Sequence, residues 1–395
     1  MSAPLLALNV GSATLKFTTF DIQGREPRVL VRGLVDGIGQ AEGRLAARAA
    51  DGQVLCDEPL REVRHENAIA QVLALAESGR NRPGAIVHRV VHGGELFSRA
   101  TRVDGEVCAQ LHSLTPLAPL HQPAALAGLE AARRAALGVV QIACFDTAFH
   151  ATQDPLATRF AIDRRWHDAG VRRYSFHGLS YAAISHQLPA VLGEGEADKR
   201  VVVLHLGSGS SGCVLHRRRS VANSTGMGAC EGLMMGTRPG NLDPEVLLYW
   251  MEHGGMDIPA VRRELYRNSG LLGVSGESSD MRVLLASDSP QARLAVELYC
   301  YRAAREVAAL AAQAGGVDHL VFTAGIGERS ATVRAMILER LSWLGFALDA
   351  ATNAAQAVHG GAARLSSADS QRGIWVIPTD EEGQMAREAM ALLAG

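Results

Sequence analysis

Residues 7–17 read ALNVGSATLKF, and residues 203–215 read VLHLGSGSSGCVL. Each stretch begins as an apolar, strand-like run, turns on glycine and serine, and returns as a second strand-like run, which is the pattern of a β-hairpin. The same strand–turn–strand pattern occurs once in each half of the chain, and this indicates an internal repeat. We therefore predict two similar α/β lobes that face each other.

The segments around these hairpins alternate between strand-like and helix-like patterns. Apolar, β-branched runs predict strands, and apolar residues at helical spacing predict helices. Strands are expected at 28–34, 45–50, 85–91, 139–145, 200–206 and 374–377, and helices at 66–77, 123–136, 244–253, 292–314, 331–344 and 385–393. The acidic stretch 192–198 is expected to be a surface loop. This order of elements predicts an α/β fold with helices flanking each sheet.

The composition is that of an ordinary globular protein. A length of 395 residues predicts two domains, and 47% apolar residues suffice for their cores. A net charge of −2 gives no electrostatic case for nucleic acid or an acidic membrane as partner. The sequence lacks a membrane-length apolar run and the basic flank of a signal peptide, so we expect a cytoplasmic protein. Six scattered cysteines without a CxxC pair favour free thiols over a disulfide framework or a zinc site.

Three glycine-rich turns, at 11–14, 207–212 and 325–328, follow apolar runs. Such turns expose backbone N–H groups in a concavity that suits phosphate oxygens. One such turn alone is more often an ordinary hairpin, but three together favour phosphate binding. Residues 207–212 also fit GxGxxG, yet a strand-like rather than helical segment follows, which argues against a dinucleotide site. The absence of GxxxxGK[ST] excludes a P-loop enzyme.

Charged side chains stand beside several of these predicted strands. Lys16 shares a strand face with Thr14 and could reach a phosphate, although a solvated edge lysine fits equally well. Arg89 lies at the mouth of a buried strand, and Arg238 lies between glycines. Two guanidinium groups from separate lobes suit transfer between two anions. Asp146 ends a strand, where a carboxylate can organise a metal or orient a reacting group.

Two histidines, His121 and His177, lie in loops that we expect at strand ends. A single loop histidine is more often structural than catalytic. Together with the nearby arginine and aspartate positions, however, the two become candidates for a catalytic site.

Taken together, these segments resemble the acetate/propionate kinase family, part of the superfamily of sugar kinases, heat-shock ATPases and actin. Ordered blocks carry the resemblance along essentially the whole chain: LNVGSATLK, HRVVHGGE, PLAPLHQP, FDTAFH, RRYSFHGLS, HLGSGSS, MGTRPG, SGESSDMR, FTAGIGE and PTDEE. The resemblance implies two ribonuclease-H-like lobes with duplicated mixed sheets around a nucleotide cleft. Their expected limits are residues 1–150 with 384–395, and residues 151–383.

The resemblance also implies an activity. It is reversible, in-line phosphoryl transfer from ATP to a short-chain carboxylate, which yields ADP and acetyl or propionyl phosphate. The resemblance further implies that the enzyme uses Mg²⁺ or Mn²⁺ and forms a homodimer. Because a carboxylate is already deprotonated at neutral pH, catalysis is expected to rest on positioning and charge neutralisation.

Residue roles follow from the resemblance position by position. The implied catalytic residues are Arg89, Asp146, His177, Arg238 and His121, of which the arginines bind acid and phosphoryl group. The implied walls of the acid pocket are Arg89, Val91, Leu120, Phe176 and Ala229. The implied nucleotide contacts are Ser12, Thr14, Lys16, Gly207, Ser208, Gly209, Asp280, Met281, Arg282, Gly325, Ile326 and Arg329. Asn9 and Glu381 would hold the metal, and Asp146 would orient the metal–phosphate assembly.

Several positions depart from the family pattern. Ser208 and Arg329 stand where the family usually has asparagine, Gln122 also replaces asparagine, and Tyr181 replaces histidine. Ala229 replaces a proline that lines the acid pocket. A smaller wall could admit propionate, since one methylene is worth only about 1–3 kcal/mol of discrimination.

Three alternatives stay open at this point. Ser208 and Arg329 motivate a variant in which pyrophosphate or another nucleotide is the donor. A non-catalytic nucleotide-binding protein on the same fold is a second alternative, against which the retained charged residues argue. A nicotinamide oxidoreductase would rest on residues 207–212 alone. The preferred acid and the physiological direction also remain open.

Overall fold

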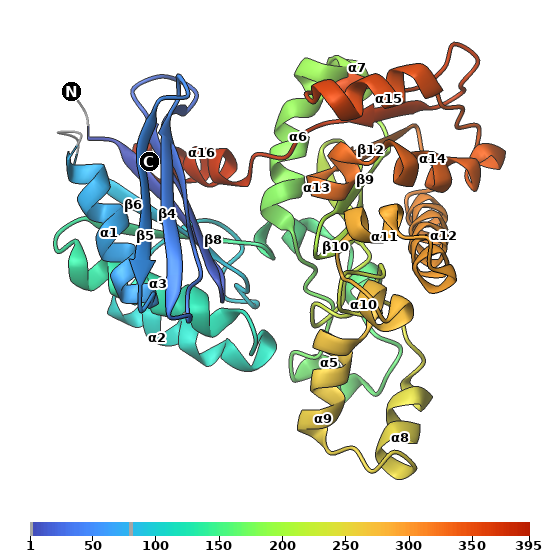
Figure 1. Ribbon diagram of the computed structural model, residues 1–395, viewed down its shortest axis with the longest axis horizontal. Coiled ribbons are helices and arrows are strands. Elements are labelled where there is room, and N and C mark those ends of the chain that lie inside the picture. The colour runs from blue at the N-terminus through green and yellow to red at the C-terminus, as the bar shows by residue number, and fades with distance from the viewer. Residues whose placement is uncertain (1–2, 79–81) are drawn as a thin grey trace. The chain divides into compact units, whose positions relative to one another are not determined.

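The computed structural model describes residues 3–78 and 82–395, and the chain forms two compact units (Figure 1). The first unit comprises Met1–Phe149 and Asp380–Gly395, and the second comprises His150–Thr379. The units thus divide at 149/150 and 379/380, where the sequence suggested 150/151 and 383/384. Each unit has a sheet and an apolar core of its own.

The first unit is built on a mixed sheet with the strand order β5-β4-β3-β2-β1-β6-β8-β7. Its strands are β1 (Leu5–Val10), β2 (Thr14–Asp21), β3 (Arg28–Asp36), β4 (Glu42–Ala49), β5 (Val54–Arg61), β6 (Ala85–Val90), β7 (Thr101–Arg102) and β8 (Val140–Phe145). Its helices are α1 (His65–Ser78), α2 (Gly105–Ser113), α3 (Gln122–Ala135) and α16 (Glu381–Ala394).

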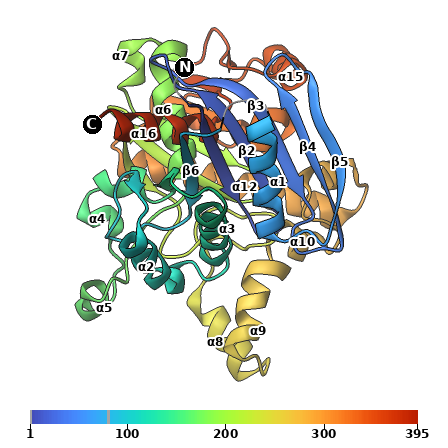
Figure 2. The same cartoon turned by 90° about the vertical axis from the view of Figure 1, so that its left-hand side faces the viewer.

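Both faces of β1 are buried because helices cover each of them. Leu6 and Leu8 pack into the core that α1 and α3 close, and these two helices lie side by side (Figure 2). Successive residues of a strand point to opposite faces, so Leu5 and Ala7 lie on the other face. Helix α16 packs on β1, β6 and β8, and its apolar side, including Met385, is buried. This explains why residues 5–8 of β1 are all apolar rather than alternating with polar ones.

The second unit has the strand order β11-β10-β9-β12-β14-β13. Its strands are β9 (Val201–Leu206), β10 (Ser210–His216), β11 (Arg219–Asn223), β12 (His319–Thr323), β13 (Ala363–Arg364) and β14 (Gly373–Val376). Its helices are α4 (Pro155–Thr158), α5 (Arg164–Asp168), α6 (Gly178–Leu192), α7 (Glu194–Ala197), α8 (Pro244–Glu252), α9 (Ile258–Arg263), α10 (Gly270–Ser275), α11 (Met281–Ala286), α12 (Pro290–Gln313), α13 (Ala324–Arg329), α14 (Ala331–Glu339) and α15 (Ala350–His359).

The two sheets repeat one topology. In the first unit β1 pairs antiparallel with β2 and parallel with β6, and β6 pairs parallel with β8. In the second unit β9 pairs antiparallel with β10 and parallel with β12, and β12 pairs parallel with β14. The orders β3-β2-β1-β6-β8 and β11-β10-β9-β12-β14 therefore correspond strand by strand. The predicted α/β fold with a duplicated mixed sheet is confirmed.

Some local predictions were wrong. The turn expected at 325–328 lies inside α13, because a carboxylate oxygen of Glu328 accepts the N–H of Ala324 at 2.8 Å and stabilises the first turn despite its glycines. The loop expected at 192–198 contains α7. The helix expected over 331–344 ends at Glu339, and a short 3₁₀ helix follows. Strand β5 and helix α6 were not anticipated.

Across residues 3–78 and 82–395, no helix combines the length and the apolar character that a membrane crossing requires.

Candidate functional site

A charged cluster lies at one edge of the first unit's sheet. Asn9 and Arg89 come from the ends of β1 and β6, and Asp146 directly follows β8. These three strands are parallel, so their carboxyl ends meet at one edge, where α/β folds commonly bind ligands. Arg89 contacts Asp146 at two points, Nε to Oδ1 at 3.1 Å and Nη2 to Oδ2 at 2.5 Å. Its Nη1 donates to Oδ1 of Asn9 at 3.2 Å.

Glu381, at the start of α16, adds a second carboxylate to this cluster. Burial raises the pKa of Glu381 to about 7; Arg89 opposes the rise, whereas Asp146 adds to it. Burial alone would lower the pKa of Arg89. The carboxylates of Asp146 and Glu381 have the larger combined effect, so the pKa of Arg89 is raised. The cluster thus combines one firmly held cation with crowded acidic groups.

The donor atoms of this cluster fit magnesium or manganese. Asp146 and Glu381 supply carboxylate oxygens and Asn9 an amide oxygen, which are the hard ligands that these ions prefer. A divalent cation would also relieve the repulsion between the two carboxylates, which shows in the raised pKa of Glu381. The predicted metal residues are therefore chemically suited to the ion.

The turn between β1 and β2 lies at the same end of the sheet. The N–H of Gly11 donates to the carbonyl of Thr14 at 2.8 Å and closes the turn, leaving Ser12 exposed. Lys16 pairs with Asn9 across the hairpin, and its positive charge acts on Glu381. Three predicted nucleotide contacts thus stand beside the candidate metal residues.

The other predicted residues of the first unit lie in two loops. Val91 follows β6 and is buried, whereas Leu120 is 37% exposed. His121 immediately precedes α3 and follows a 3₁₀ helix rather than a strand, so the prediction of a strand end was wrong. The buried side chain of Gln122 fixes this loop, since it accepts the N–H of His92 at 3.2 Å and donates to the His92 carbonyl at 3.1 Å.

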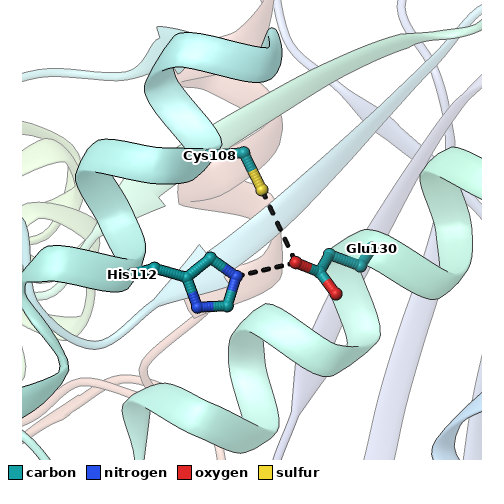
Figure 3. Close-up of side chains that lie close together, drawn as sticks. All are labelled: Cys108, His112 and Glu130. Carbon is teal, nitrogen blue, oxygen red and sulfur yellow. Dashed lines mark hydrogen bonds and ion pairs between the residues drawn. The ribbon is translucent and has the colours of Figure 1, made fainter.

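Cys108, His112 and Glu130 form a separate group on α2 and α3 (Figure 3), with ligand-type atoms within 4.8 Å of one another. Oε1 of Glu130 lies 2.7 Å from Nε2 of His112 and accepts from the thiol of Cys108 at 3.8 Å. Arg134 lies 3.8 Å from the other carboxylate oxygen. Since Arg134 already faces the charge of Glu130 and His112 contacts the same carboxylate, we interpret the group as a polar contact that ties together the helices flanking the His121 loop.

The second unit contains a cavity of about 530 Å³, a size typical of small-molecule sites. Its walls come from the turn after β9, from α11 with the preceding Asp280, and from α13 with the following Ser330. The lining residues are Gly207, Ser208, Asp280, Met281, Arg282, Leu285, Ala286, Gly325, Ile326, Arg329 and Ser330. Eight of them are predicted nucleotide contacts, which the structure brings together around one cavity. Leu285, Ala286 and Ser330 were missed, although Leu285 lies one helical turn after Met281.

Arg334 was also missed. It is completely buried, and its Nη1 donates to the carbonyls of Gly327 and Glu328 at 2.8 and 2.9 Å. Its Nε donates to Oδ1 of Asn353 at 2.7 Å. Arg334 therefore fixes the end of α13, the helix that forms one wall of the cavity.

Arg238 and His177 converge on Gly209, next to the cavity. A Cβ atom built on Gly209 would lie 2.8 Å from Nη2 of Arg238 and 3.4 Å from Nε2 of His177. Nη1 of Arg238 donates to the carbonyl of Ala229 at 2.6 Å. Burial lowers the pKa of Arg238, and within the described residues no carboxylate forms an ion pair with it. A largely buried guanidinium without a counter-ion is suited to an incoming anion.

His177 is preceded by Phe176, a predicted wall of the acid pocket. Phe176 is buried, and its N–H donates to Oγ1 of Thr225 at 2.9 Å. His177 itself adopts a left-handed conformation with φ of 58° at the start of α6, so it follows a loop between helices and not a strand. Ala229 is half-buried in the same unit, whereas Val91 and Leu120 belong to the first unit.

Known proteins resemble this chain in both sequence and structure. The sequence matches the model of the acetokinase family over residues 4–387. It is 46% identical to an acetate kinase from Rhodopseudomonas palustris over the full length of both chains, and 44% identical to one from Rhizobium meliloti over 99% of this chain and 98% of that protein. A crystal structure of a propionate kinase from Francisella tularensis superimposes with a TM-score of 0.90 at 31% identity, covering 98% and 99% of the two chains. That of Porphyromonas gingivalis acetate kinase gives 0.88 at 34% identity, covering 99% and 100%.

The full-length relatives and the duplicated α/β fold identify a kinase with a carboxyl group as phosphoryl acceptor. More narrowly, the chain belongs to the acetokinase family.

Proposed function

We propose that the chain catalyses reversible phosphoryl transfer between ATP and a short-chain carboxylate, acetate or propionate, by direct in-line attack. The observation that carries the proposal is Arg238, which has no carboxylate partner among the described residues and stands beside His177 at Gly209. The neighbouring residues Gly207 and Ser208 line the cavity, so a donor bound there would present its phosphates toward two cationic or hydrogen-bonding groups.

Each unit would supply its own part of the chemistry. In the second unit, the turn at Gly207 and Ser208 holds the donor phosphates, while Arg238 and His177 neutralise charge on the migrating phosphoryl group. In the first unit, Arg89 holds Asp146 through Nε and Nη2, and the second N–H groups of Nη1 and Nη2 remain for the acid's carboxylate. The carboxylate oxygen attacks phosphorus, the P–O bond to ADP breaks, and no proton has to be removed.

We propose Asn9 and Glu381 as residues that hold Mg²⁺ or Mn²⁺, with Asp146 orienting the metal–phosphate assembly. When bound, the ion neutralises phosphate charge during transfer. Arg89 keeps Asp146 in place through its two-point contact. Titrating magnesium in a kinase assay tests this assignment, and activity that persists in excess chelator would refute it.

The cavity favours a nucleotide over pyrophosphate as donor. Met281, Leu285 and Ile326 give its wall apolar surface, which suits a base and a ribose and would be superfluous for pyrophosphate. Arg282 on α11 and Arg329 on α13 also line the cavity and can meet phosphate charge. The departures Ser208 and Arg329 from the family pattern thus change the lining without closing the cavity.

The decisive experiment traps acyl phosphate as a hydroxamate. Acetate, propionate and butyrate are each incubated with Mg-ATP, other nucleotides or pyrophosphate. We expect signal with ATP and with acetate or propionate. If folded protein gives no signal with any combination, the proposal is refuted. Signal with pyrophosphate alone would show that pyrophosphate, and not ATP, is the donor. ATP binding without transfer would indicate a non-catalytic protein.

We also propose that the chain forms a homodimer, as the sequence resemblance implies. Helices α8 and α9 pack on each other and carry the exposed apolar side chains Leu248, Tyr249 and Ile258, at 48%, 62% and 64% exposure, which suit an interface with a second copy. Light scattering after size-exclusion chromatography tests this, and a monomer at micromolar concentration would contradict it.

A further inference from the structure

The imidazole of His177 is held by two buried hydroxyl groups in series. Its Nδ1 lies 2.7 Å from Oγ of Ser211, and that Oγ lies 2.6 Å from the hydroxyl of Tyr181. Both Ser211 and Tyr181 are completely buried. Tyr181 stands four residues after His177, one turn into α6, which brings its side chain to the same face of the helix. Ser211 reaches them from β10.

The phenol sets the direction in which protons point along this series. Burial raises the pKa of Tyr181 well above its ordinary value, so the phenol keeps its proton at neutral pH. A backbone hydrogen bond from His205 reaches the phenol oxygen, which fills an acceptor position. In the described part of the chain, Oγ of Ser211 is the one side-chain atom placed to receive the phenol proton.

The positions of the other two protons, on Ser211 and on His177, follow from that of the phenol proton. Because Tyr181 donates to Ser211, the serine directs its own proton to Nδ1 of His177. Nδ1 then acts as an acceptor, and a neutral imidazole with an accepting Nδ1 carries its proton on Nε2. Nε2 is the atom that lies near Gly209, next to Nη2 of Arg238. An N–H at this point can donate to an anion, whereas a bare lone pair would repel it.

We propose that Ser211 and Tyr181 are positioning residues, which hold His177 in the Nε2–H tautomer so that it donates a hydrogen bond to the migrating phosphoryl group. The inference rests on the proposed function, because it assigns His177 a partner in that reaction. It adds two residues that the family pattern did not suggest, one of which, Tyr181, departs from that pattern.

Packing alone fixes the plane of the ring but not the place of its proton. His177 stacks on His205, with ring centres 4.3 Å apart and planes 15° from parallel. His205 is in turn held through Nδ1, 2.8 Å from Oγ of Ser180. Removal of a hydroxyl from Tyr181 or Ser211 leaves this stack in place. A tautomer measurement therefore separates the proposed role from general packing.

The test uses Tyr181→Phe and Ser211→Ala, with Tyr299→Phe as matched control. Tyr299 is also buried, and its hydroxyl lies 3.0 Å from Oγ of Ser210, the residue next to Ser211. Full-length protein with ¹⁵N-labelled histidine is studied by long-range ¹H–¹⁵N correlation at alkaline pH, where imidazoles are neutral. A His177→Gln variant identifies the His177 signals. The kcat and the KM for ATP are measured on each variant.

We expect Nε2–H in the wild type, and a mixture with Nδ1–H in both variants. The kcat should fall about tenfold in Tyr181→Phe and about a hundredfold in Ser211→Ala, with the KM for ATP changed less than about twofold. The double variant should be no slower than Ser211→Ala, because both residues act through one series. Tyr299→Phe should change neither the tautomer nor the kcat.

Three results would overturn the inference, and the first two are Nδ1–H as the main wild-type form and Tyr181→Phe with wild-type tautomer and kcat. Equal loss of kcat in Tyr299→Phe would do the same, because it would point to general packing. If the wild type forms no acyl phosphate with any donor, the proposed function fails. The tautomer spectra then still decide whether the two hydroxyls orient His177.

Discussion

Gly209 leaves the space that the guanidinium of Arg238 occupies: a Cβ atom there would lie 2.8 Å from Nη2. Since the neighbour is the end of a flexible side chain, Gly209→Ala should displace Arg238 rather than disrupt the fold. We expect the kcat for hydroxamate formation to fall about tenfold or more, with the melting temperature nearly unchanged. Gly195→Ala, in α7, meets open space and serves as control. Wild-type kcat in Gly209→Ala would contradict the role of Arg238.

Asp146→Asn should weaken both stability and catalysis. It removes the charge that Arg89 faces at two points, and Arg89 is only 23% exposed. We expect the free energy of unfolding in urea to fall by about 2 kcal/mol. The magnesium concentration for half-maximal activity should rise and the kcat should drop. Asp57→Asn is the matched control, because Asp57 also binds an arginine, Arg44, at two points but on the surface. Equal effects of the two variants would refute the prediction.

His88 should make the protein sensitive to acid. Burial lowers the pKa of His88 to about 4, whereas an unfolded chain has about 6.5, so between these values the unfolded state binds the proton more readily. The stability is therefore fully present above pH 6.5 and is lost as the pH falls toward 4. His88→Gln should reduce the difference between unfolding free energies at pH 7 and pH 5 by about 2 kcal/mol. The exposed His216→Gln should leave this difference unchanged, and an unchanged difference in His88→Gln would contradict the assignment.

Ala286→Trp should block the cavity of the second unit. The residue lines the cavity near the end of α11, and an indole there would fill part of its 530 Å³. We expect the KM for ATP to rise about tenfold or more, while the KM for acetate stays within about twofold. Val283→Trp, on the same helix but away from the lining, is the control. If both variants behave alike, the nucleotide does not occupy this cavity.

The central strands could be predicted from the sequence because burial on both faces leaves a plain signature. β1 and β9 are each apolar except for one residue near the end, Asn9 and His205, and each leads into a glycine–serine turn that returns as a second strand. Helix α13 could not be predicted in the same way, because its start depends on the side-chain carboxylate of Glu328 and its end on the side chain of Arg334, seven residues after Gly327. The low helix propensity of glycine was the signal that the sequence analysis used, and these side-chain hydrogen bonds overrode it.

In the candidate site, too, some residues could be predicted from the sequence and others could not. Arg89 and Asp146 could be predicted, since charged residues at the ends of parallel strands meet at one edge. The contact between Tyr181 and Ser211 could not, because it joins a helix that was not anticipated to a strand 30 residues away. Leu285 and Ala286 were missed because apolar helix residues are ordinarily part of a core, and nothing in their spacing marks a cavity wall.

The last segment of the chain, Asp380–Gly395, belongs to the unit whose other part is Met1–Phe149. During synthesis on the ribosome, β1, β6 and β8 emerge early, but α16, which covers them, emerges last. The first unit must wait, with one face of its sheet open, until the whole second unit has been translated. Glu381 arrives on the same helix, so a nascent chain cannot complete its proposed metal site before it completes its fold.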